Sequence, residues 1–145
     1  MQLTQFSDYS LRVLIYLGNK KAPATVQEIS KGFQVNRNHL VKVVHRMAQL
    51  GLLNTAKGSK GGISLSKDPS FYKVGDIVKM MEPHLDLVEC FDSKSNTCPI
   101  IGVCDLQVVL TRARDEFIAH LNKYSLQDLL ITKNTTEKLK RLGLS

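Results

Sequence analysis

Apolar residues recur at three- and four-residue steps along the first fifty positions, which predicts three consecutive helices. Ser7 is the expected N-cap of the first helix, which ends at Gly18. Most of its inward face comes from Leu11, Val13, Leu14 and Ile15. The second helix, TVQEISKGF, opens on the capping-box pattern of Thr25 and Glu28. Both helices therefore carry one apolar face toward the interior.

The third helix is RNHLVKVVHRMAQL, which Asn36 can cap and Gly51 ends. It follows the second helix after a tight turn at Gln34 and Val35, and two short helices joined in this way form a helix-turn-helix. The second helix of such a pair reads DNA, and here its solvent side is basic or polar. The residues expected nearest the base edges are Arg37, Asn38, His39 and Lys42.

The next stretch, LLNTAKGSKGGISLS, predicts a β-hairpin, because two alternating strands flank a glycine-rich basic tip. A small cationic tip can enter a minor groove or lie along phosphates, so we interpret the hairpin as the wing of a winged helix. Its expected DNA contacts are Lys57, Ser59 and Lys60. A phosphate-binding loop is the weaker alternative, since GSKGG lacks the GxxxxGK(S/T) spacing.

Beyond the wing, VGDIVKMME predicts a short helix, in which Met80 and Met81 are expected to fill the core. A long helix then starts after Cys104 and runs over residues 105–124, about 30 Å at 1.5 Å per residue. We expect its apolar stripe to pair with a second copy of the chain, the alternative being a helix packed only on its own subunit. The stripe consists of Leu106, Val109, Leu110, Ala113, Phe117 and Leu121.

A short helix capped by Ser125 and a tail, either a marginal amphipathic helix or a disordered end, complete the chain. The predicted fold is mainly α with a small β-hairpin wing: a winged helix-turn-helix head plus a long dimerisation helix. We divide it into a DNA-binding head (1–72), a connecting helix with a cysteine-containing loop (73–104), and a dimerisation helix with a helical tail (105–145).

Positive charge is concentrated in the first half of the chain. Residues 1–75 hold eleven Lys and Arg against three Asp and Glu, a net charge of +8, whereas residues 76–145 hold nine against ten, a net charge of −1. Such a field favours double-stranded DNA as partner; a solvated basic surface or a winged helix used for protein contacts is the alternative. No apolar run approaches the ~18 residues of a membrane span and no signal peptide is recognisable, so a cytoplasmic location is expected.

Three cysteines, Cys90, Cys98 and Cys104, fall within fifteen residues of a loop-like stretch. Soft thiolates select zinc, copper(I) or iron-sulfur clusters. Structural zinc favours four ligands with short spacings, whereas seven and then five residues intervene here, which suits the separated irons of a cluster. A fourth ligand must then come from elsewhere. Buried structural thiols, or a disulfide with one thiol left over, are the alternatives, and a reducing compartment disfavours the disulfide.

No acid-base residues group with the cysteines as a redox enzyme would require, so the chain is not expected to be an enzyme. A zinc-stabilised winged-helix regulator remains the competing hypothesis. A cluster that senses iron or redox state is a third, because a labile ligand would also admit oxidants.

Five segments resemble the NsrR branch of the Rrf2 family of winged-helix repressors: MQLTQFSDYSLRVLIYL, NRNHLVKVVHRMAQLG, KGSKGGISL, VGDIVKMMEP and the spaced cysteines. The resemblance covers nearly the whole chain. It implies a homodimeric repressor that senses nitric oxide through an iron-sulfur cluster, 4Fe-4S in preference to 2Fe-2S, and that releases an inverted-repeat operator when the cluster is nitrosylated or lost. It also implies that Cys90, Cys98 and Cys104 are the cluster ligands, with an acidic residue of the opposite subunit, here Asp8, as the fourth.

Two departures concern the ligand set. IscR-type relatives, which hold a 2Fe-2S centre, place a histidine three residues after the last cysteine, where this chain has Gln107. Their cysteines are also spaced by five residues in both gaps, whereas the gap between Cys90 and Cys98 has seven here. His84, which precedes the loop, is the obvious substitute ligand, the alternative being an exposed histidine without a metal.

Overall fold

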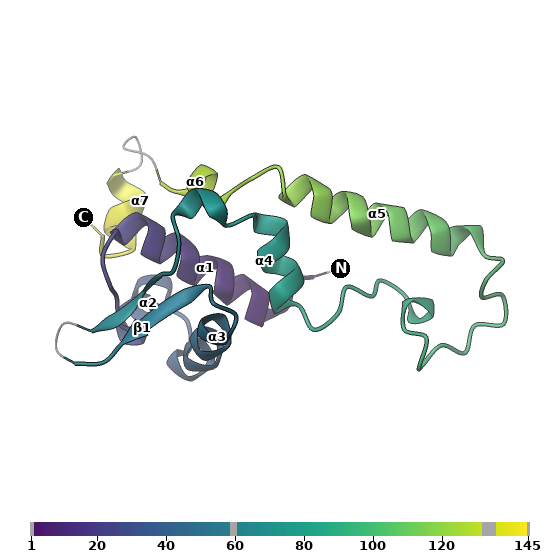
Figure 1. Ribbon diagram of the computed structural model, residues 1–145, viewed down its shortest axis with the longest axis horizontal. Helices are drawn as coiled ribbons and strands as arrows, with labels where there is room; N and C mark the ends of the chain where they lie inside the picture. The colour runs from purple at the N-terminus through teal and green to yellow at the C-terminus, as the bar shows by residue number, and fades with distance from the viewer. Residues whose placement is uncertain (1, 59–60, 132–135, 145) are drawn as a thin grey trace.

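The structure is a computed structural model that describes residues 2–58, 61–131 and 136–144. Within these residues the chain is mainly helical with one antiparallel hairpin, which confirms the predicted fold class (Figure 1). Two 3₁₀ turns, η1 (Pro69–Phe71) and η2 (Glu89–Phe91), separate longer elements. Those elements are α1 (Gln5–Lys20), α2 (Val26–Phe33), α3 (Arg37–Gln49), β1 (Leu53–Ala56), β2 (Gly62–Leu65), α4 (Val74–Met81), α5 (Asp105–Leu121), α6 (Leu126–Leu129) and α7 (Thr136–Arg141).

Helix α1 begins one turn earlier than predicted. Its N-cap is Thr4, whose Oγ1 accepts a hydrogen bond from the Ser7 backbone N–H at 3.3 Å. The prediction of Ser7 as the cap was wrong, because Thr4 satisfies the free N–H groups first and Ser7 is buried inside the helix. Asp8 stays in the first helical turn, as expected.

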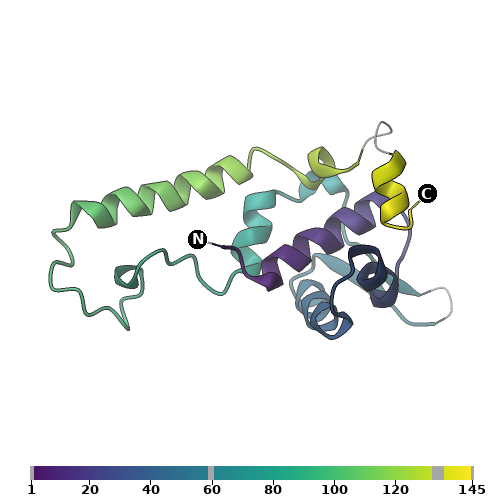
Figure 2. The ribbon, with the colours of Figure 1, turned by 180° about the vertical axis from the view of Figure 1, so that it is seen from behind.

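Helix α1 lies at the centre of a core that α2, α3, α4, α6 and the base of the hairpin share (Figures 1 and 2). Val13 and Leu14 of α1 are fully enclosed, and Ile29, Leu40 and Met47 meet them from α2 and α3. The apolar faces of the first three predicted helices thus pack as their periodicity indicates. In α4, Met81 is buried but Met80 is 43% exposed, so the expectation that both methionines fill the core was wrong for Met80.

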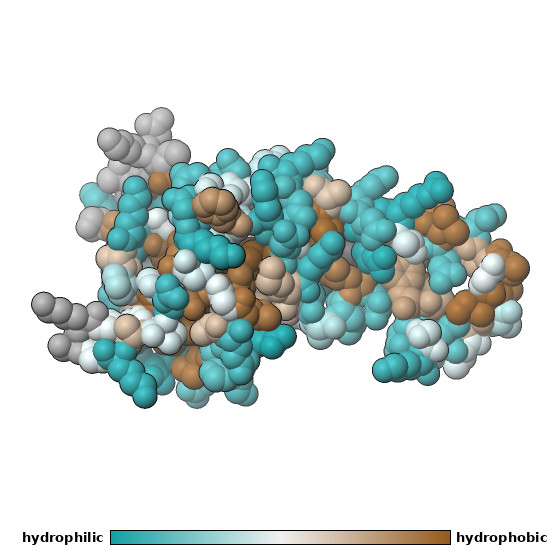
Figure 3. Space-filling view, in the orientation of Figure 1, coloured by the Kyte–Doolittle hydropathy of each residue, from teal (hydrophilic) through white to brown (hydrophobic). Residues whose placement is uncertain are grey.

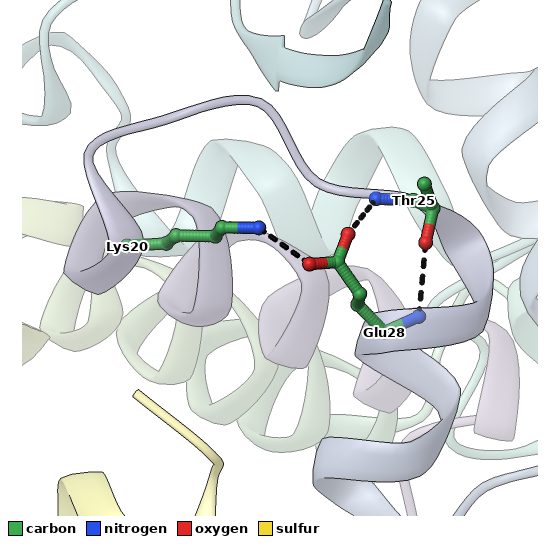
Figure 4. Close-up of polar contacts among 3 residues, drawn as sticks. All are labelled: Lys20, Thr25 and Glu28. Atoms are coloured by element: carbon green, nitrogen blue, oxygen red, sulfur yellow. Dashed lines mark hydrogen bonds and ion pairs between the residues drawn. The ribbon is translucent and has the colours of Figure 1, made fainter. Parts of the chain in front are cut away.

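The predicted capping box at the start of α2 is confirmed, and it is tied to α1 (Figure 4). The Thr25 N–H donates to Glu28 Oε2 at 2.6 Å, and the Glu28 N–H donates to Thr25 Oγ1 at 3.1 Å. Lys20 Nζ, from the end of α1, donates to the other oxygen of Glu28 at 2.7 Å. This hydrogen bond from Lys20, with those from Thr25, lowers the pKa of Glu28. One carboxylate therefore fixes where α2 starts and how it lies on α1.

The hairpin is anchored to the helices at its base. Leu53 pairs with Leu65 and Thr55 with Ile63, in the register that the alternation predicts. Ile63 also exchanges two backbone hydrogen bonds with Ala24, the residue before the N-cap of α2. Behind the hairpin, the buried Tyr72 hydroxyl donates to the Leu52 carbonyl at 2.8 Å. The predicted wing is therefore attached to the helix-turn-helix at a fixed angle.

Residues 82–122 form an arm that extends away after α4 and returns along α5 (Figures 1 and 2). From here on, the head means the rest of the described chain, α4 included. The arm starts at Glu82, whose Oε1 accepts hydrogen bonds from the Thr4 N–H at 2.8 Å and Oγ1 at 3.3 Å. It ends at Asn122, whose amide oxygen accepts from the Asp76 N–H and whose amide nitrogen donates to Asp76 Oδ1, both at 2.9 Å. One foot of the arm is thus hydrogen-bonded to the start of α1 and the other to the first turn of α4.

Helix α5 is 17 residues long, about 26 Å, and ends three residues before the predicted position 124. It packs on α4 at its C-terminal end only, where Ile118 is the one buried residue of the helix. Leu106 and Val109 of the predicted stripe are 61% and 60% exposed. The N-terminal half of the predicted stripe is therefore not buried within this chain. None of the described helices has the length and apolar character needed to cross a membrane.

Candidate functional site

The three cysteines line one hollow of about 480 Å³ beside the N-terminal end of α5. Cys90 lies in η2, Cys98 in the loop, and Cys104 is the N-cap residue of α5. All three are free and half-buried, which does not match the fully buried thiols considered as an alternative. Apolar walls complete the hollow, from Val88, Ile100, Leu106 and Leu110.

Short-range hydrogen bonds shape the loop between the first two cysteines. Glu89 Oε1 accepts from the Thr97 N–H at 2.7 Å and from its hydroxyl at 2.8 Å. These bonds, the backbone one first, lower the pKa of Glu89. Asn96 Oδ1 accepts from the Cys98 N–H at 3.0 Å, and Asp92 closes a turn by accepting from Lys94 and Ser95. The Glu89–Thr97 contact thereby brings Cys90 and Cys98, the residues that follow these two, back toward each other.

Helix α5 holds the loop through two side chains. Gln107 Nε2 donates to the Cys90 carbonyl at 3.3 Å, and the Arg114 guanidinium lies 5.0 Å from the centre of the Phe91 ring. A guanidinium at this distance from an aromatic face is attracted by the ring. Gln107 therefore supports the backbone of a proposed ligand at the position where IscR-type relatives place a histidine.

The donors fit an iron-sulfur cluster in type and grouping. Among the described residues, no three His, Cys, Asp or Glu side chains converge closely enough to hold a single metal ion. Three thiols around one shared hollow are instead the donors that a cluster needs, because its irons lie apart and each takes a thiolate. A tetrahedral zinc ion, which needs its ligands at one point, fits this arrangement less well.

Asp8 does not line the cysteine hollow of its own chain. It lies in the first turn of α1, where its side chain is 43% exposed. Its two carboxylate oxygens accept hydrogen bonds from Arg12, one from Nη2 at 2.7 Å and one from Nε at 3.0 Å. This hydrogen bonding raises the pKa of Arg12 above its ordinary value. A carboxylate reachable from outside the subunit is thus presented on the head. The other candidate ligand, His84, is 66% exposed, approaches Asp86 at 3.7 Å and lies outside the hollow.

The solvent side of α3 forms the candidate DNA-reading surface. Its N-cap Asn36 accepts from the N–H groups of Asn38 and His39 at 2.8 and 3.2 Å, which fixes the start of the helix. The four residues predicted to read bases, Arg37, Asn38, His39 and Lys42, are all exposed, while the opposite face of α3 is in the core. Lys57 is exposed at the end of the wing, and Ser59 and Lys60 lie outside the described residues.

Three residues near the site were not singled out from the sequence. Arg12 pairs with Asp8, and its i,i+4 spacing on a predicted helix was a usable signal. Tyr9 lies between Asp8 and the recognition helix, with its ring 6.4 Å from that of His39. Glu82 contacts Thr4 across 78 positions, and no local pattern could have indicated such a pair.

A recognition helix with a free basic surface, a wing and a projecting helix define the chain as a DNA-binding transcriptional regulator of the winged-helix class. Residues 3–132 match the Rrf2 family, described as iron-dependent transcriptional regulators. The HTH-type transcriptional regulator NsrR of Bacillus subtilis is 40% identical over 144 residues, 98% of this chain and 99% of the relative. The chain belongs to the Rrf2 family, and within it is of the NsrR type.

Solved structures with low sequence identity share the fold. CymR of B. subtilis, titled the global cysteine regulator, superposes with a TM-score of 0.71 over 89% of this chain and 95% of its own, at 22% identity. T. potens IscR superposes with a TM-score of 0.72 over 89% of this chain and 85% of its own, at 17% identity. These likenesses concern the architecture alone.

Proposed function

We propose that the chain is a homodimeric repressor that holds an iron-sulfur cluster in its cysteine hollow and releases operator DNA when nitric oxide attacks that cluster. The observation that carries the proposal is the grouping of all three free cysteines around one hollow. This hollow lies at the start of α5, where the apolar stripe of the helix is exposed. The NsrR-type resemblance over the whole chain supports nitric oxide as the signal.

The exposed surface of the arm supports a dimer. Figure 3 shows hydrophobic surface at its free end, and Ile100, Ile101, Val103, Leu106 and Val109 are each 47% to 81% exposed. Large apolar side chains exposed together in one region of a surface are typical of a site of association. In a dimer with a two-fold axis beside α5, each recognition helix would bind one half of an inverted repeat.

Cys90, Cys98 and Cys104 would hold three positions of a 4Fe-4S cluster, and Asp8 of the partner subunit the fourth. When bound, the cluster supplies iron that reacts with nitric oxide. The Asp8 carboxylate is a harder donor than a thiolate and the more easily replaced one. It already has a second partner in Arg12, so the carboxylate is not left unpaired when it dissociates from iron.

The Asp8 bond would tie the head of one subunit to the arm of the other. Breaking it frees the two heads from a fixed separation, and an inverted-repeat operator is then bound by heads at variable spacing. A difference of about 2.7 kcal/mol between the two states would change operator affinity about hundredfold.

The test is a visible absorption spectrum of anaerobically purified protein, taken before and after nitric oxide, with operator binding followed in the same samples. Iron-sulfur absorbance that bleaches together with loss of DNA binding is the expected result. A colourless, zinc-containing protein that binds DNA regardless would contradict the proposal and favour the structural-metal regulator. Bleaching by oxidants or iron chelation, without any response to nitric oxide, would favour the iron- or redox-sensing regulator instead.

Variants separate the ligands from the scaffold. Cys98→Ala is expected to abolish the visible absorbance, and Asp8→Ala to leave a cluster that is lost faster and responds differently to nitric oxide. Glu116→Ala, which removes an exposed carboxylate on α5, is the matched control and should behave as wild type. An Asp8→Ala protein with unchanged cluster lability and nitric oxide response would rule out Asp8 as the fourth ligand.

A further inference from the structure

The C-terminal end of α5 approaches α4 very closely, and Gly75 makes this approach possible. Gly75 lies in the first turn of α4 and is buried. A methyl carbon at position 75 would lie 2.6 Å from the Ile118 carbonyl oxygen and 2.5 Å from the amide oxygen of Asn122. Non-bonded atoms attract each other best at about 3.5–4 Å, so both approaches would be repulsive. Because the Ile118 oxygen belongs to the backbone, any side chain at position 75 requires α4 and α5 to move apart.

Hydrogen bonds fix the same end of α5 to the first turn of α4. Asn122, the residue that ends α5, accepts from the Asp76 N–H and donates to Asp76 Oδ1, both at 2.9 Å. Two residues further on, the Tyr124 carbonyl accepts from the Val74 N–H at 3.1 Å. The first N–H groups of a helix have no acceptor within the helix itself, and here the end of α5 supplies two. This joint between α4 and α5 therefore has a definite geometry, with its closest approach at Gly75.

The other foot of the arm constrains its direction less. The hydrogen bonds between Thr4 and Glu82 are exposed to solvent. Residues 83–104, all of which the structure describes, contain the 3₁₀ turn η2 and no α-helix. The direction in which α5 leaves the head is thus set mainly at the joint with α4 (Figure 2).

Helix α5 separates this joint from the proposed dimer surface. Leu106 and Val109, the exposed apolar residues of that surface, lie at the opposite end of the helix. Ile118 follows Leu106 by twelve residues, about 18 Å at 1.5 Å per residue. A rotation of about 10° at the joint would therefore displace the head by about 3 Å relative to the dimer surface, close to the rise of about 3.4 Å between successive base pairs.

We propose that Gly75 determines which separation of operator half-sites the protein prefers, because it sets the angle between α5 and the head. The proposal rests on the proposed function in so far as the chain is taken to be a homodimer on an inverted repeat. In such a dimer, the two-fold axis repeats the angle in the second subunit, and the separation of the two heads follows from it. Gly75 is then a specificity-determining residue that lies outside the DNA-reading surface.

Operators with spacers of different length test the proposal. The affinity of the anaerobically purified protein is measured for the preferred operator and for operators with one or two base pairs added or removed between the half-sites. Wild type is expected to bind the preferred spacing about tenfold more tightly than its neighbours. Gly75→Ala should reduce this preference about fivefold or more, and should bind one of the altered operators more tightly than wild type does. Met80→Ala, on the exposed side of α4, is the matched control and should keep the wild-type preference.

The affinity for an isolated half-site separates a change of geometry from a general loss of structure. Gly75→Ala leaves the residues of α3 and the wing unaltered, so its half-site affinity should stay within about twofold of wild type. An equal loss on the half-site and on every spacing would show a merely structural role and contradict the inference, as would an unchanged preference.

A second variant covers the case in which Gly75→Ala fails to fold, as monitored by circular dichroism. Asn122→Ala removes the hydrogen bonds of the joint without inserting a group into it. It is expected to flatten the preference among spacings about fivefold, because the angle is then held less firmly. A wild-type preference in Asn122→Ala would overturn the proposal.

The wild-type measurements distinguish this inference from the function on which it rests. A monomeric wild-type protein in analytical ultracentrifugation, or a wild type that binds all spacings alike, would overturn the homodimeric repressor and this inference with it. A dimeric wild type whose clear spacing preference persists in Gly75→Ala would overturn the role of Gly75 alone.

Discussion

Apolar residues are buried in the head of this chain and largely exposed in its arm. In the head, Leu14, Ile29 and Leu40 are at most 1% exposed, and helices far apart in sequence share them. In the arm, α5 buries only Ile118, at its foot, and turns Leu106 and Val109 to solvent. The head thus buries its apolar residues within one chain, whereas the arm leaves apolar residues exposed, as the proposed dimer requires.

This difference separates two tasks. A self-sufficient head presents its DNA-reading residues in a geometry fixed by its own core. In the proposed dimer, the arm would respond to what holds the two subunits together, and all three cysteines lie in it. Four experiments would sharpen or break this comparison.

The largest effect is expected from truncation in the head. Leu14→Ala removes a fully buried side chain and should lower the free energy of unfolding by about 3 kcal/mol. Leu106→Ala, the same change at a 61% exposed position, should cost less than about 0.5 kcal/mol at protein concentrations where the chain is monomeric. Urea unfolding measures both, and equal losses would show that the arm has a core of its own.

Association should respond to a charge on the arm. Leu106→Asp is expected to weaken the dimer about hundredfold, about 2.7 kcal/mol, because it places a carboxylate in the proposed apolar interface. Ala119→Asp, on the opposite side of α5 and exposed, is the matched control. Analytical ultracentrifugation decides, and a Leu106→Asp protein that dimerises like wild type would place the interface elsewhere.

A smaller effect is expected where the arm joins the head. Asn122→Ala removes two hydrogen bonds to Asp76 and leaves the Asp76 N–H, in the first turn of α4, without its acceptor. The free energy of unfolding should therefore fall by about 1–2 kcal/mol. Lys123→Ala, at the exposed neighbouring position, should have no measurable effect. If both variants unfold alike, this foot does not contribute to stability.

The smallest effect concerns pH. The pKa of Glu28 is lowered in the folded protein, so the stabilisation by its hydrogen bonds is complete above the ordinary value of 4.5 and is lost as the pH falls through the lower folded value. The glutamate is largely exposed, which limits this contribution to less than about 1 kcal/mol. Urea unfolding of wild type and Glu28→Gln at several pH values should show the acid-dependent part in wild type alone; the same pH profile in both would rule it out.

Most of the head could be predicted because its signals are local. The Thr25–Glu28 capping box, the Asn36 cap and the alternation in the hairpin each lie within a few residues. The cap of α1 was misplaced by three residues, since Thr4 and Ser7 are both good caps and only the structure shows which one is free to accept.

What could not be predicted depends on residues distant in sequence. Periodicity indicated the stripe of α5 but not that its N-terminal half would leave the head altogether. The grouping of the cysteines was predicted as a ligand set, whereas their shared hollow and the contact of Gln107 with the Cys90 carbonyl follow from how the loop turns back on α5. Met80 failed as a core residue because α4 is covered on one side only.

The two feet of the arm, at Glu82 and Asn122, have a consequence for the divergence of such proteins. Glu82 is fixed to the start of α1 through Thr4, and Asn122 is fixed to α4 through Asp76, so insertions or deletions between them leave the attachment points unchanged. Evolution can therefore lengthen or shorten the stretch between Cys90 and Cys98 without altering the DNA-reading surface. A change in the spacing of these cysteines is then confined to a closed excursion of the chain and leaves the helices that carry it in place.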